Sequence, residues 1–441
     1  MMPFVRELMM AAVASGGGGS SDYWIATIGG AGTTLNLSCI ALDSAGNIYV
    51  ADRLKNTPTW SPIVLIKYSS SGDIQWQKRL SGNAEDSALS IATDGTSIYI
   101  TGYSRSIDTI QVAYLAKYSC SDGALMWQIG RKISPYALFN NVALASTGDV
   151  YAVGNFGTNT GAIAFIMKFT SSGSLSWQKS LGSGSNNVTN FNGVVVGSDG
   201  SVYVSGLDGG GNYDLILAKY SSAGALQTGW PKTLVGSSTN DIGYDLALDS
   251  SGNIYIAGIS NSSQKILITK YNSTGTHQWH RTLYDNTSNI LGFDIVKIAI
   301  DSNNNIYIAA ISSNHIIIAK YNSSGVVQWQ RYLTKSINNF NNSSVDIAVI
   351  GSALYIVSTK KVNAPVGPAE EQGLLVRLPL DGTLTGTYDG WVYSASTLTE
   401  QNGILTVGTR TLTAATSTLL ATIGTLTSEN SSFTIAKTPV G

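Results

Sequence analysis

Short apolar runs alternate with polar turn residues along most of this chain. In one stretch the runs are Ile40–Leu42, Ile48–Val50, Val64–Tyr68 and Ile74–Leu80. They are rich in Ile, Val and Tyr and are bounded by Gly, Ser, Asn and Asp, a composition that favours β-strands over helices. The pattern therefore predicts a unit of four short strands.

The four-strand unit recurs with a period of about 51 residues. The second run of each copy carries a tyrosine: Tyr49, Tyr99, Tyr151, Tyr203, Tyr255, Tyr307 and Tyr355. The third run carries a basic residue: Lys67, Lys117, Lys168, Lys219, Lys270, Lys320 and Arg377. The fourth run carries a tryptophan in all copies but the last: Trp76, Trp127, Trp177, Trp230, Trp279 and Trp329. Repeated four-strand units of this length predict an all-β fold, a seven-bladed β-propeller.

Residues that recur in every copy are interpreted as parts of the blade. A tryptophan at the same place in each copy is suited to fill the gap between adjacent sheets. The lysine stem packs on the blade and leaves its amine at the rim. The repeated aspartates, such as Asp43 and Asp249, supply one carboxylate per hairpin, which fits turn capping better than a calcium loop.

The connections between runs are of two kinds, which predicts two different faces. Asp43–Asn47 and Ser69–Gly72 are tight hairpins that recur in nearly the same form. The other connections vary in length and content, and binding residues concentrate on such loops. We therefore expect recognition on the variable face. The candidate binding residues are its aromatic and charged side chains: Arg53, Lys55, Trp60, Tyr103, Arg105 and Glu370.

The seventh copy lacks its fourth run, and a matching run lies at the other end of the chain. Tyr23–Gly30 has the spacing of Gln75–Gly82. We expect this N-terminal strand, with Trp24, Ile25 and Ile28, to pair with Leu374–Leu378 and close the ring. The alternative is that Leu384–Tyr388 supplies the missing strand.

The chain divides by composition into three parts. Residues 1–21 hold a short apolar stretch, with Phe4, Val5, Leu8 and Met9, before a Gly/Ser linker. This part is interpreted as a docking peptide for another protein, and the alternative is a disordered tail. Residues 22–380 form the propeller. Residues 381–441 are a threonine-rich β extension, expected to lie on the propeller or on a neighbouring chain.

Composition and motifs argue against several functions. The net charge is −1 with 12% charged residues, so nucleic-acid binding is not expected. The N-terminal apolar stretch is too short to span a membrane. His277, His280 and His315 lack metal-ligand spacing. No phosphate-binding loop or complete nucleophile elbow is present. We expect no metal, no cofactor and no catalytic residues, and no enzyme activity, since the sequence shows no polar cluster for the mouth of the central channel.

Three segments resemble known propellers. Asp249–Gly258 resembles repeats of the SBBP type and, more loosely, NHL repeats. Thr274–Trp279 resembles the tryptophan-docking motif of quinoprotein-like propellers, but the quinone-binding residues have no counterpart. The opening Asp22–Gly30, with Tyr388–Ser394 and the threonine-rich ending, resembles propeller-bearing virion structural proteins of marine tailed phages, especially cyanophages.

The last resemblance implies a non-enzymatic virion structural protein, located in a tail, an appendage or on the capsid. It would dock on other virion proteins through the N-terminal peptide and would bind a host-surface glycan or protein. Whether it forms a homo-oligomer stays open. The alternative is a secreted, extracellular bacterial propeller that binds glycan or protein.

Overall fold

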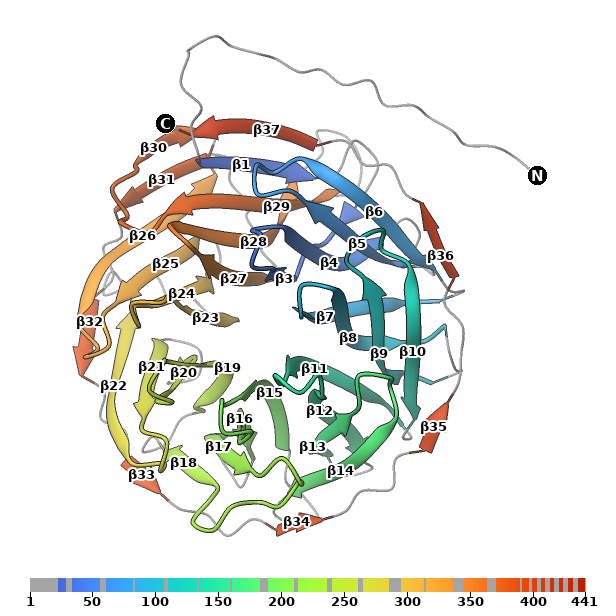
Figure 1. Ribbon diagram of the computed structural model, residues 1–441. Coiled ribbons are helices and arrows are strands. Elements are labelled where there is room, and N and C mark those ends of the chain that lie inside the picture. The colour runs from blue at the N-terminus through green and yellow to red at the C-terminus, as the bar shows by residue number, and fades with distance from the viewer. Residues whose placement is uncertain are drawn as a thin grey trace.

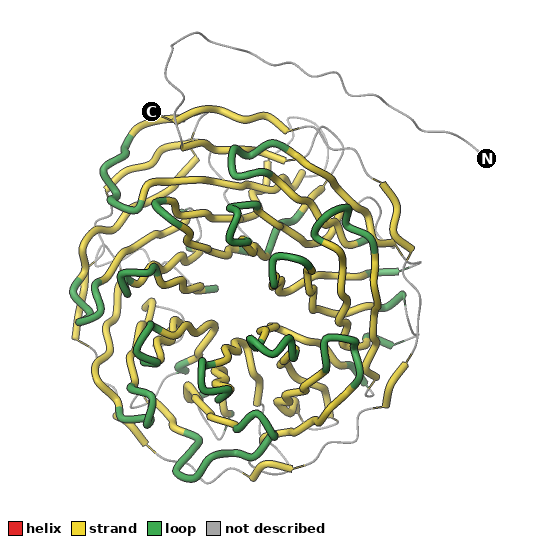
Figure 2. Tube along the Cα trace, viewed as in Figure 1, coloured by secondary structure: helices red, strands yellow, loops and turns green. Residues whose placement is uncertain are grey.

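The computed structural model describes strands and the loops between them, and its described residues contain no helix (Figure 2). The described residues are 23–28, 34–55, 61–81, 84–106, 110–132, 135–158, 161–182, 189–209, 213–235, 240–260, 265–284, 295–312, 315–335, 344–362, 370–388, 391–395, 399–402, 406–408, 413–415, 420–422, 427–430 and 435–440.

Seven antiparallel sheets stand around a common centre and form the blades of a propeller (Figure 1). The predicted all-β, seven-bladed fold is confirmed. From the centre outward, the strands of blades 1 to 3 are β3 (Cys39–Leu42), β4 (Ile48–Lys55), β5 (Ile63–Tyr68) and β6 (Ile74–Ser81); β7 (Asp86–Thr93), β8 (Ser97–Ser104), β9 (Val112–Ser119) and β10 (Leu125–Lys132); and β11 (Ala137–Leu144), β12 (Val150–Thr158), β13 (Gly161–Phe169) and β14 (Leu175–Gly182). A short strand, β2 (Thr34–Leu35), also pairs with β4.

Blades 4 to 7 repeat the same order. Their strands are β15 (Thr189–Val196), β16 (Val202–Asp208), β17 (Asp214–Tyr220) and β18 (Lys232–Val235); β19 (Ile242–Leu248), β20 (Ile254–Ser260), β21 (Lys265–Tyr271) and β22 (His277–Tyr284); β23 (Val296–Ile300), β24 (Ile306–Ile311), β25 (Ile316–Tyr321) and β26 (Val327–Lys335); and β27 (Val345–Ile350), β28 (Ala353–Val362), β29 (Glu370–Pro379) and β1 (Tyr23–Ile28).

The N-terminal strand closes the ring as predicted. Strand β1 pairs antiparallel with β29, with Trp24 opposite Arg377 and Ile28 opposite Gly373. Trp24, Ile25 and Ile28 are all buried. The alternative strand is not used here, because β30 (Gly386–Tyr388) pairs instead with β31 (Trp391–Ala395) in the sheet of blade 6.

The C-terminal extension forms a belt around the outside of the ring, and we call residues 391–440 the C-terminal belt (Figure 1). It adds an outer strand to blades 6, 5, 4, 3, 2, 1 and 7 in that order, opposite to the order of the repeats. After β31 these strands are β32 (Thr399–Asn402), β33 (Thr406–Gly408), β34 (Thr413–Ala415), β35 (Leu420–Thr422), β36 (Thr427–Asn430) and β37 (Ile435–Val440). The extension therefore packs on its own propeller.

The repeated tryptophan and lysine join each blade to the next. In blade 1, Lys67 Nζ and Trp76 Nε1 donate to the Cys120 carbonyl of blade 2 over 3.0 and 3.1 Å. The indole of Trp76 lies against Gly123, where an added Cβ would come within 2.8 Å of the ring. The tryptophan thus fills the space between sheets, as the repeat predicts.

The same contact closes the ring. The indole of Trp24 in blade 7 lies against Gly72 of blade 1, where an added Cβ would come within 2.6 Å of the ring. Trp24 is therefore the seventh member of the tryptophan series, although it comes first in the chain.

The repeated aspartate caps its hairpin. Asp249 Oδ1 accepts from the backbone N–H groups of Ser251 and Asn253, and its Oδ2 accepts from the hydroxyl of Tyr255 at 3.0 Å. Burial raises the pKa of Asp249, but these hydrogen bonds outweigh it and hold the pKa below its ordinary value. Turn capping is therefore the role of this carboxylate.

Candidate binding site at the channel mouth

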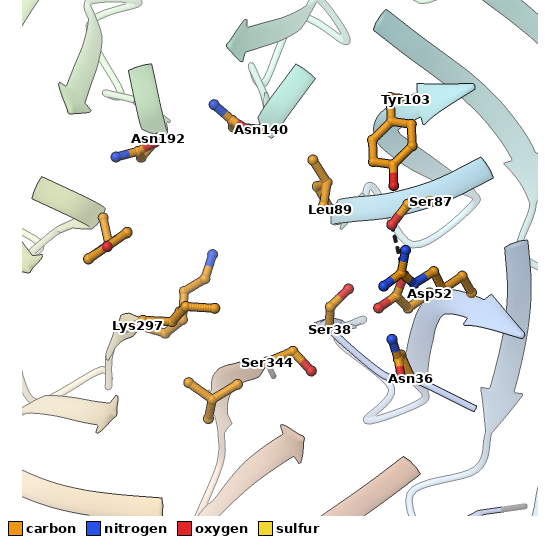
Figure 3. A pocket seen from close by; sticks show the side chains of 14 residues that line it. Asn36, Ser38, Asp52, Ser87, Leu89, Tyr103, Asn140, Asn192, Lys297 and Ser344 are labelled. Carbon is orange, nitrogen blue, oxygen red and sulfur yellow. Dashed lines mark hydrogen bonds between the residues drawn. The ribbon is translucent and has the colours of Figure 1, made fainter. Parts of the chain in front are cut away.

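The innermost strand of each blade begins on the face of the variable connections, which we call the loop face. The opposite face, built from the tight hairpins, is the hairpin face. A cavity of about 360 Å³ opens at the centre of the loop face, and we call it the channel-mouth pocket (Figure 3). Every blade contributes to its wall, mostly with polar side chains: Asn36, Ser38, Asp52, Arg53, Ser87, Leu89, Tyr103, Asn140, Asn192, Tyr244, Ile295, Lys297, Ser344 and Val345.

Hydrogen bonds between neighbouring blades hold the wall of this pocket. Ser38 Oγ donates to the Ala88 carbonyl at 3.0 Å. Asn140 Nδ2 donates to the Asn190 side chain at 2.7 Å and to the Phe191 carbonyl at 2.9 Å. Asn192 Nδ2 donates to the Gly243 carbonyl at 2.9 Å. The polar side chains are positioned by the ring itself, which suits a rigid binding site.

Two half-buried carboxylates, Asp245 and Asp346, continue this series. Asp245 Oδ2 accepts from the backbone N–H of Ile298 in the next blade at 3.2 Å. Asp346 Oδ2 accepts from the backbone N–H of Ile40 in blade 1 at 3.0 Å. Each carboxylate therefore links two inner strands and places a negative charge beside the channel.

Lys297 lies between these two carboxylates along the ring of blades, and its amine projects into the open centre of the pocket (Figure 3). Burial lowers the pKa of Lys297, but the charges of Asp245 and Asp346 outweigh it and raise the pKa above its ordinary value. Burial raises the pKa of Asp346 to about 6, although the Lys297 charge opposes it. Among the described residues, none forms a hydrogen bond or ion pair with the ammonium of Lys297.

Asp52 is a third carboxylate near the channel, and it is buried and lines the pocket. Its Oδ1 accepts from Ser87 Oγ at 3.1 Å. Burial raises its pKa to about 6, against the lowering effect of the adjacent Arg53 charge. The pocket wall therefore combines the Asp52 carboxylate, the Lys297 ammonium and several amides in a space of ligand size, and the charges of Asp245 and Asp346 act on Lys297.

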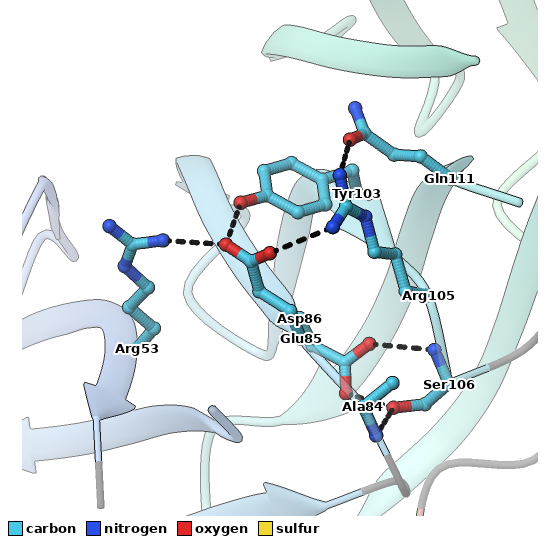
Figure 4. A network of polar contacts seen from close by, with 8 residues as sticks. All are labelled: Arg53, Ala84, Glu85, Asp86, Tyr103, Arg105, Ser106 and Gln111. Atoms are coloured by element: carbon cyan, nitrogen blue, oxygen red, sulfur yellow. Dashed lines mark hydrogen bonds and ion pairs between the residues drawn. The ribbon is translucent and has the colours of Figure 1, made fainter. Parts of the chain in front are cut away.

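Three of the predicted binding residues converge on one carboxylate, Glu85, which sequence reasoning did not select (Figure 4). Arg53 Nη1 lies 2.8 Å from Glu85 Oε1, and Arg105 Nη1 lies 3.2 Å from Glu85 Oε2. The hydroxyl of Tyr103 donates to Glu85 Oε1 at 2.8 Å. Burial, which is the larger cause, and this hydrogen bond together raise the pKa of Tyr103 to about 12. Arg53 and Tyr103 line the pocket, so this network forms part of its rim.

Two other predicted site residues lie at the ends of strands. Lys55 ends β4 and Glu370 begins β29. Trp60 lies outside the described residues, as does the predicted docking peptide with Phe4, Val5, Leu8 and Met9.

Sequence reasoning missed the residues of the inner strands. Ser90, Asn141, Asp245, Lys297 and Asp346 occupy one repeat position, since each lies two residues before the residue that pairs with the repeated tyrosine. Side chains at this position differ from copy to copy while the surrounding repeat stays the same. That contrast was a readable signal for a site at the shared centre.

Metal-binding clusters and membrane-spanning helices are both absent from the described residues. No group of three or more His, Cys, Asp or Glu side chains in the described ranges is arranged to hold a metal ion. No helix long and apolar enough to cross a membrane occurs in that part of the chain.

Comparison with known proteins supports the propeller class. The family model described as the SBBP beta-propeller repeat matches residues 225–263, in agreement with the seven-bladed propeller that the structure shows. No curated protein matches the sequence. The comparisons contain nothing specific to phage proteins.

Three solved structures are similar to this chain at low identity. A polysaccharide lyase, Uly1, is 10% identical with a TM-score of 0.50, covering 78% of this chain and 90% of its own. The quinohemoprotein alcohol dehydrogenase of Comamonas testosteroni is 10% identical with a TM-score of 0.48, covering 83% and 79%. A neuraminidase-like protein of A/little yellow-shouldered bat is 9% identical with a TM-score of 0.43, covering 80% and 98%. At this identity the likeness shows the propeller fold alone.

The prediction that this chain is not an enzyme is wrong. The polysaccharide lyase Uly1 has the same fold, so the fold gives no ground for excluding catalysis. The premise of that prediction also fails, because polar side chains from separate repeats, among them Asp52 and Lys297, line one pocket at the channel mouth. The sequence did not reveal this cluster, since its members come from separate repeats.

Proposed function

We propose that this propeller binds a protein or a glycan in the channel-mouth pocket, as a component of a tailed-phage particle. The observation that carries the binding role is the pocket itself, to which all seven blades contribute. Its polar groups are held by bonds between blades, as a pre-formed site requires. The β-propeller fold with its repeats is compatible with protein or glycan binding.

The virion role rests on the resemblance of the first and last segments to propeller-bearing phage proteins. In this proposal residues 1–14 dock the chain on another virion protein, and the loop face points toward the host. The docking peptide precedes the linker of Gly16–Gly19, which would let it engage a partner independently of the ring.

Analysis of purified particles tests the virion role. Mass spectrometry of particles from infected cultures should detect the chain, and a version lacking residues 1–14 should be lost from the particles while folding normally. Secretion of the chain by uninfected bacteria, with none in the particles, would instead favour the extracellular alternative. Incorporation of the truncated chain at the normal level would refute the docking role.

A further inference from the structure

We infer that the channel-mouth pocket is built for a neutral, hydroxyl-rich ligand, namely a terminal sugar of a glycan, rather than for an acidic one. This inference rests on the proposed binding function and names the ligand class. Three observations carry it: the hydrogen-bonding groups left open in the wall, the open ammonium of Lys297, and the charges around it.

Several hydrogen-bond donors in the pocket wall are already bonded to other groups of the protein. Both amide hydrogens of Asn140 and one of Asn192 bond to the next blade, and the hydroxyls of Ser38 and Ser344 donate to the backbone carbonyls of Ala88 and Leu37. Within the described ranges, nothing donates to the amide oxygens of Asn140 and Asn192. A ligand that completes this wall must therefore bring hydrogen-bond donors.

The open cation requires an acceptor on the same ligand. The Lys297 ammonium has three donors and lines the same pocket. A hydroxyl group both donates and accepts, so a polyol satisfies the amide oxygens and Lys297 together. A protonated amine would meet the amide oxygens but has no acceptor to offer the Lys297 ammonium.

The surrounding charges argue against an acidic ligand. Asp52 lines the pocket, and Asp245 and Asp346 act electrostatically on Lys297. Arg53 is already paired with Glu85. A carboxylate or sulfate ligand would gain one ammonium, but it would also meet the charge of Asp52 in the wall and the charges of Asp245 and Asp346 that act on Lys297, which makes its binding costly. Tyr103 and Tyr244 in the wall offer ring surface suited to the C–H face of a sugar.

Saturation-transfer NMR on the full chain tests the ligand class. The probes are the neutral sugars glucose, galactose, mannose and N-acetylglucosamine, and the acidic sugars glucuronic acid and N-acetylneuraminic acid. We expect at least one neutral sugar to bind and the acidic sugars to bind roughly tenfold more weakly or not at all. Asp52→Asn should weaken neutral-sugar binding by roughly tenfold, because it removes a charged acceptor.

Two matched tryptophan variants locate the binding. Leu89 lies at a β-bulge of β7 and lines the pocket, so Leu89→Trp should block it and abolish the signal. Ser44→Trp, at an exposed position on the hairpin face, should leave binding unchanged. Thermal unfolding of both variants confirms that they fold.

The inference is overturned if no neutral sugar binds, if an acidic sugar binds more tightly, or if Leu89→Trp folds and still binds. The same experiments distinguish a wrong ligand class from a wrong proposed function. If Leu89→Trp stops the protein from binding host cells although no sugar binds, the pocket serves another ligand and the binding role stands. If sugar binds at the pocket but the chain is absent from particles, the ligand class stands without the virion role.

Discussion

Single residues at the blade junctions should contribute measurably to the stability of the ring. The glycines that lie against the repeated tryptophans allow the most direct test. Gly72 has φ of +87° and lies under Trp24, whereas Gly95 has φ of +85° with nothing within 4 Å of an added Cβ. Gly95→Ala should cost about 1 kcal/mol for the left-handed backbone alone. Gly72→Ala should cost roughly 2 kcal/mol more, because the Cβ overpacks against the indole. Urea unfolding of both variants measures the difference, and equal losses would show that the indole contact contributes little.

Asp52 should make stability depend on pH. Its folded pKa is raised to about 6, above the ordinary value of 3.8, so the folded state holds the proton more tightly than the unfolded state. Its contribution to stability is therefore present at pH 4 and is lost as the pH rises through 6. The Asp52→Asn variant lacks this titration. The melting temperature of wild type minus that of Asp52→Asn should therefore decrease as the pH rises from 4 to 7. A constant difference across that range would contradict the assignment.

At the scale of elements, the N-terminal strand should be indispensable to the ring. Strand β1 is paired on one side with β29 and on the other with β37. Deleting residues 1–30 exposes the edge of β29 and removes Trp24. Loss of this buried tryptophan alone should lower the free energy of unfolding by about 3–5 kcal/mol. Circular dichroism should show loss of the cooperative melting transition, while deletion of residues 1–14 should leave it in place. A cooperative transition at the wild-type temperature after the longer deletion would refute closure by β1.

The C-terminal belt should protect the outer edges of the blades. Each belt strand pairs with the outermost strand of one blade. Deletion of residues 391–441 would leave seven exposed strand edges, which invite pairing between chains. We expect the truncated protein to keep its blades but to aggregate at concentrations where the full chain stays dispersed, as measured by light scattering. Unchanged scattering would show that the belt has no protective role.

Elements differ in how far the sequence predicts them. The blades were readable because turn residues and apolar runs recur, and the closing strand was readable because Trp24 has the spacing of Trp76. The sequence predicted a β extension on the propeller or on a neighbouring chain, but not which blade each belt strand joins, because these strands are as short as the three residues of Thr406–Gly408 and pair with partners far away in sequence. Short polar strands carry little local pattern, and only the edges they cover define them.

At the scale of the whole molecule, the ring creates a site that no single repeat contains. Lys297 and Asp52 are far apart in sequence and line one pocket only because seven blades share one centre, where the Asp346 charge also acts on Lys297. The sequence did predict recognition on the loop face and selected Arg53 and Tyr103, which line the pocket. It gave no means of seeing Glu85 as their common partner, since that contact bridges two blades.

The central claim is that recognition takes place in the channel-mouth pocket of the loop face. Fluorescently labelled protein should be added to the host bacteria, and cell-bound fluorescence measured for wild type, Leu89→Trp and Ser44→Trp. The account predicts that wild type and Ser44→Trp bind the cells equally, and that folded Leu89→Trp binds at least tenfold less, because its pocket is filled. Equal binding by Leu89→Trp and wild type, or loss of binding in Ser44→Trp alone, would contradict the account.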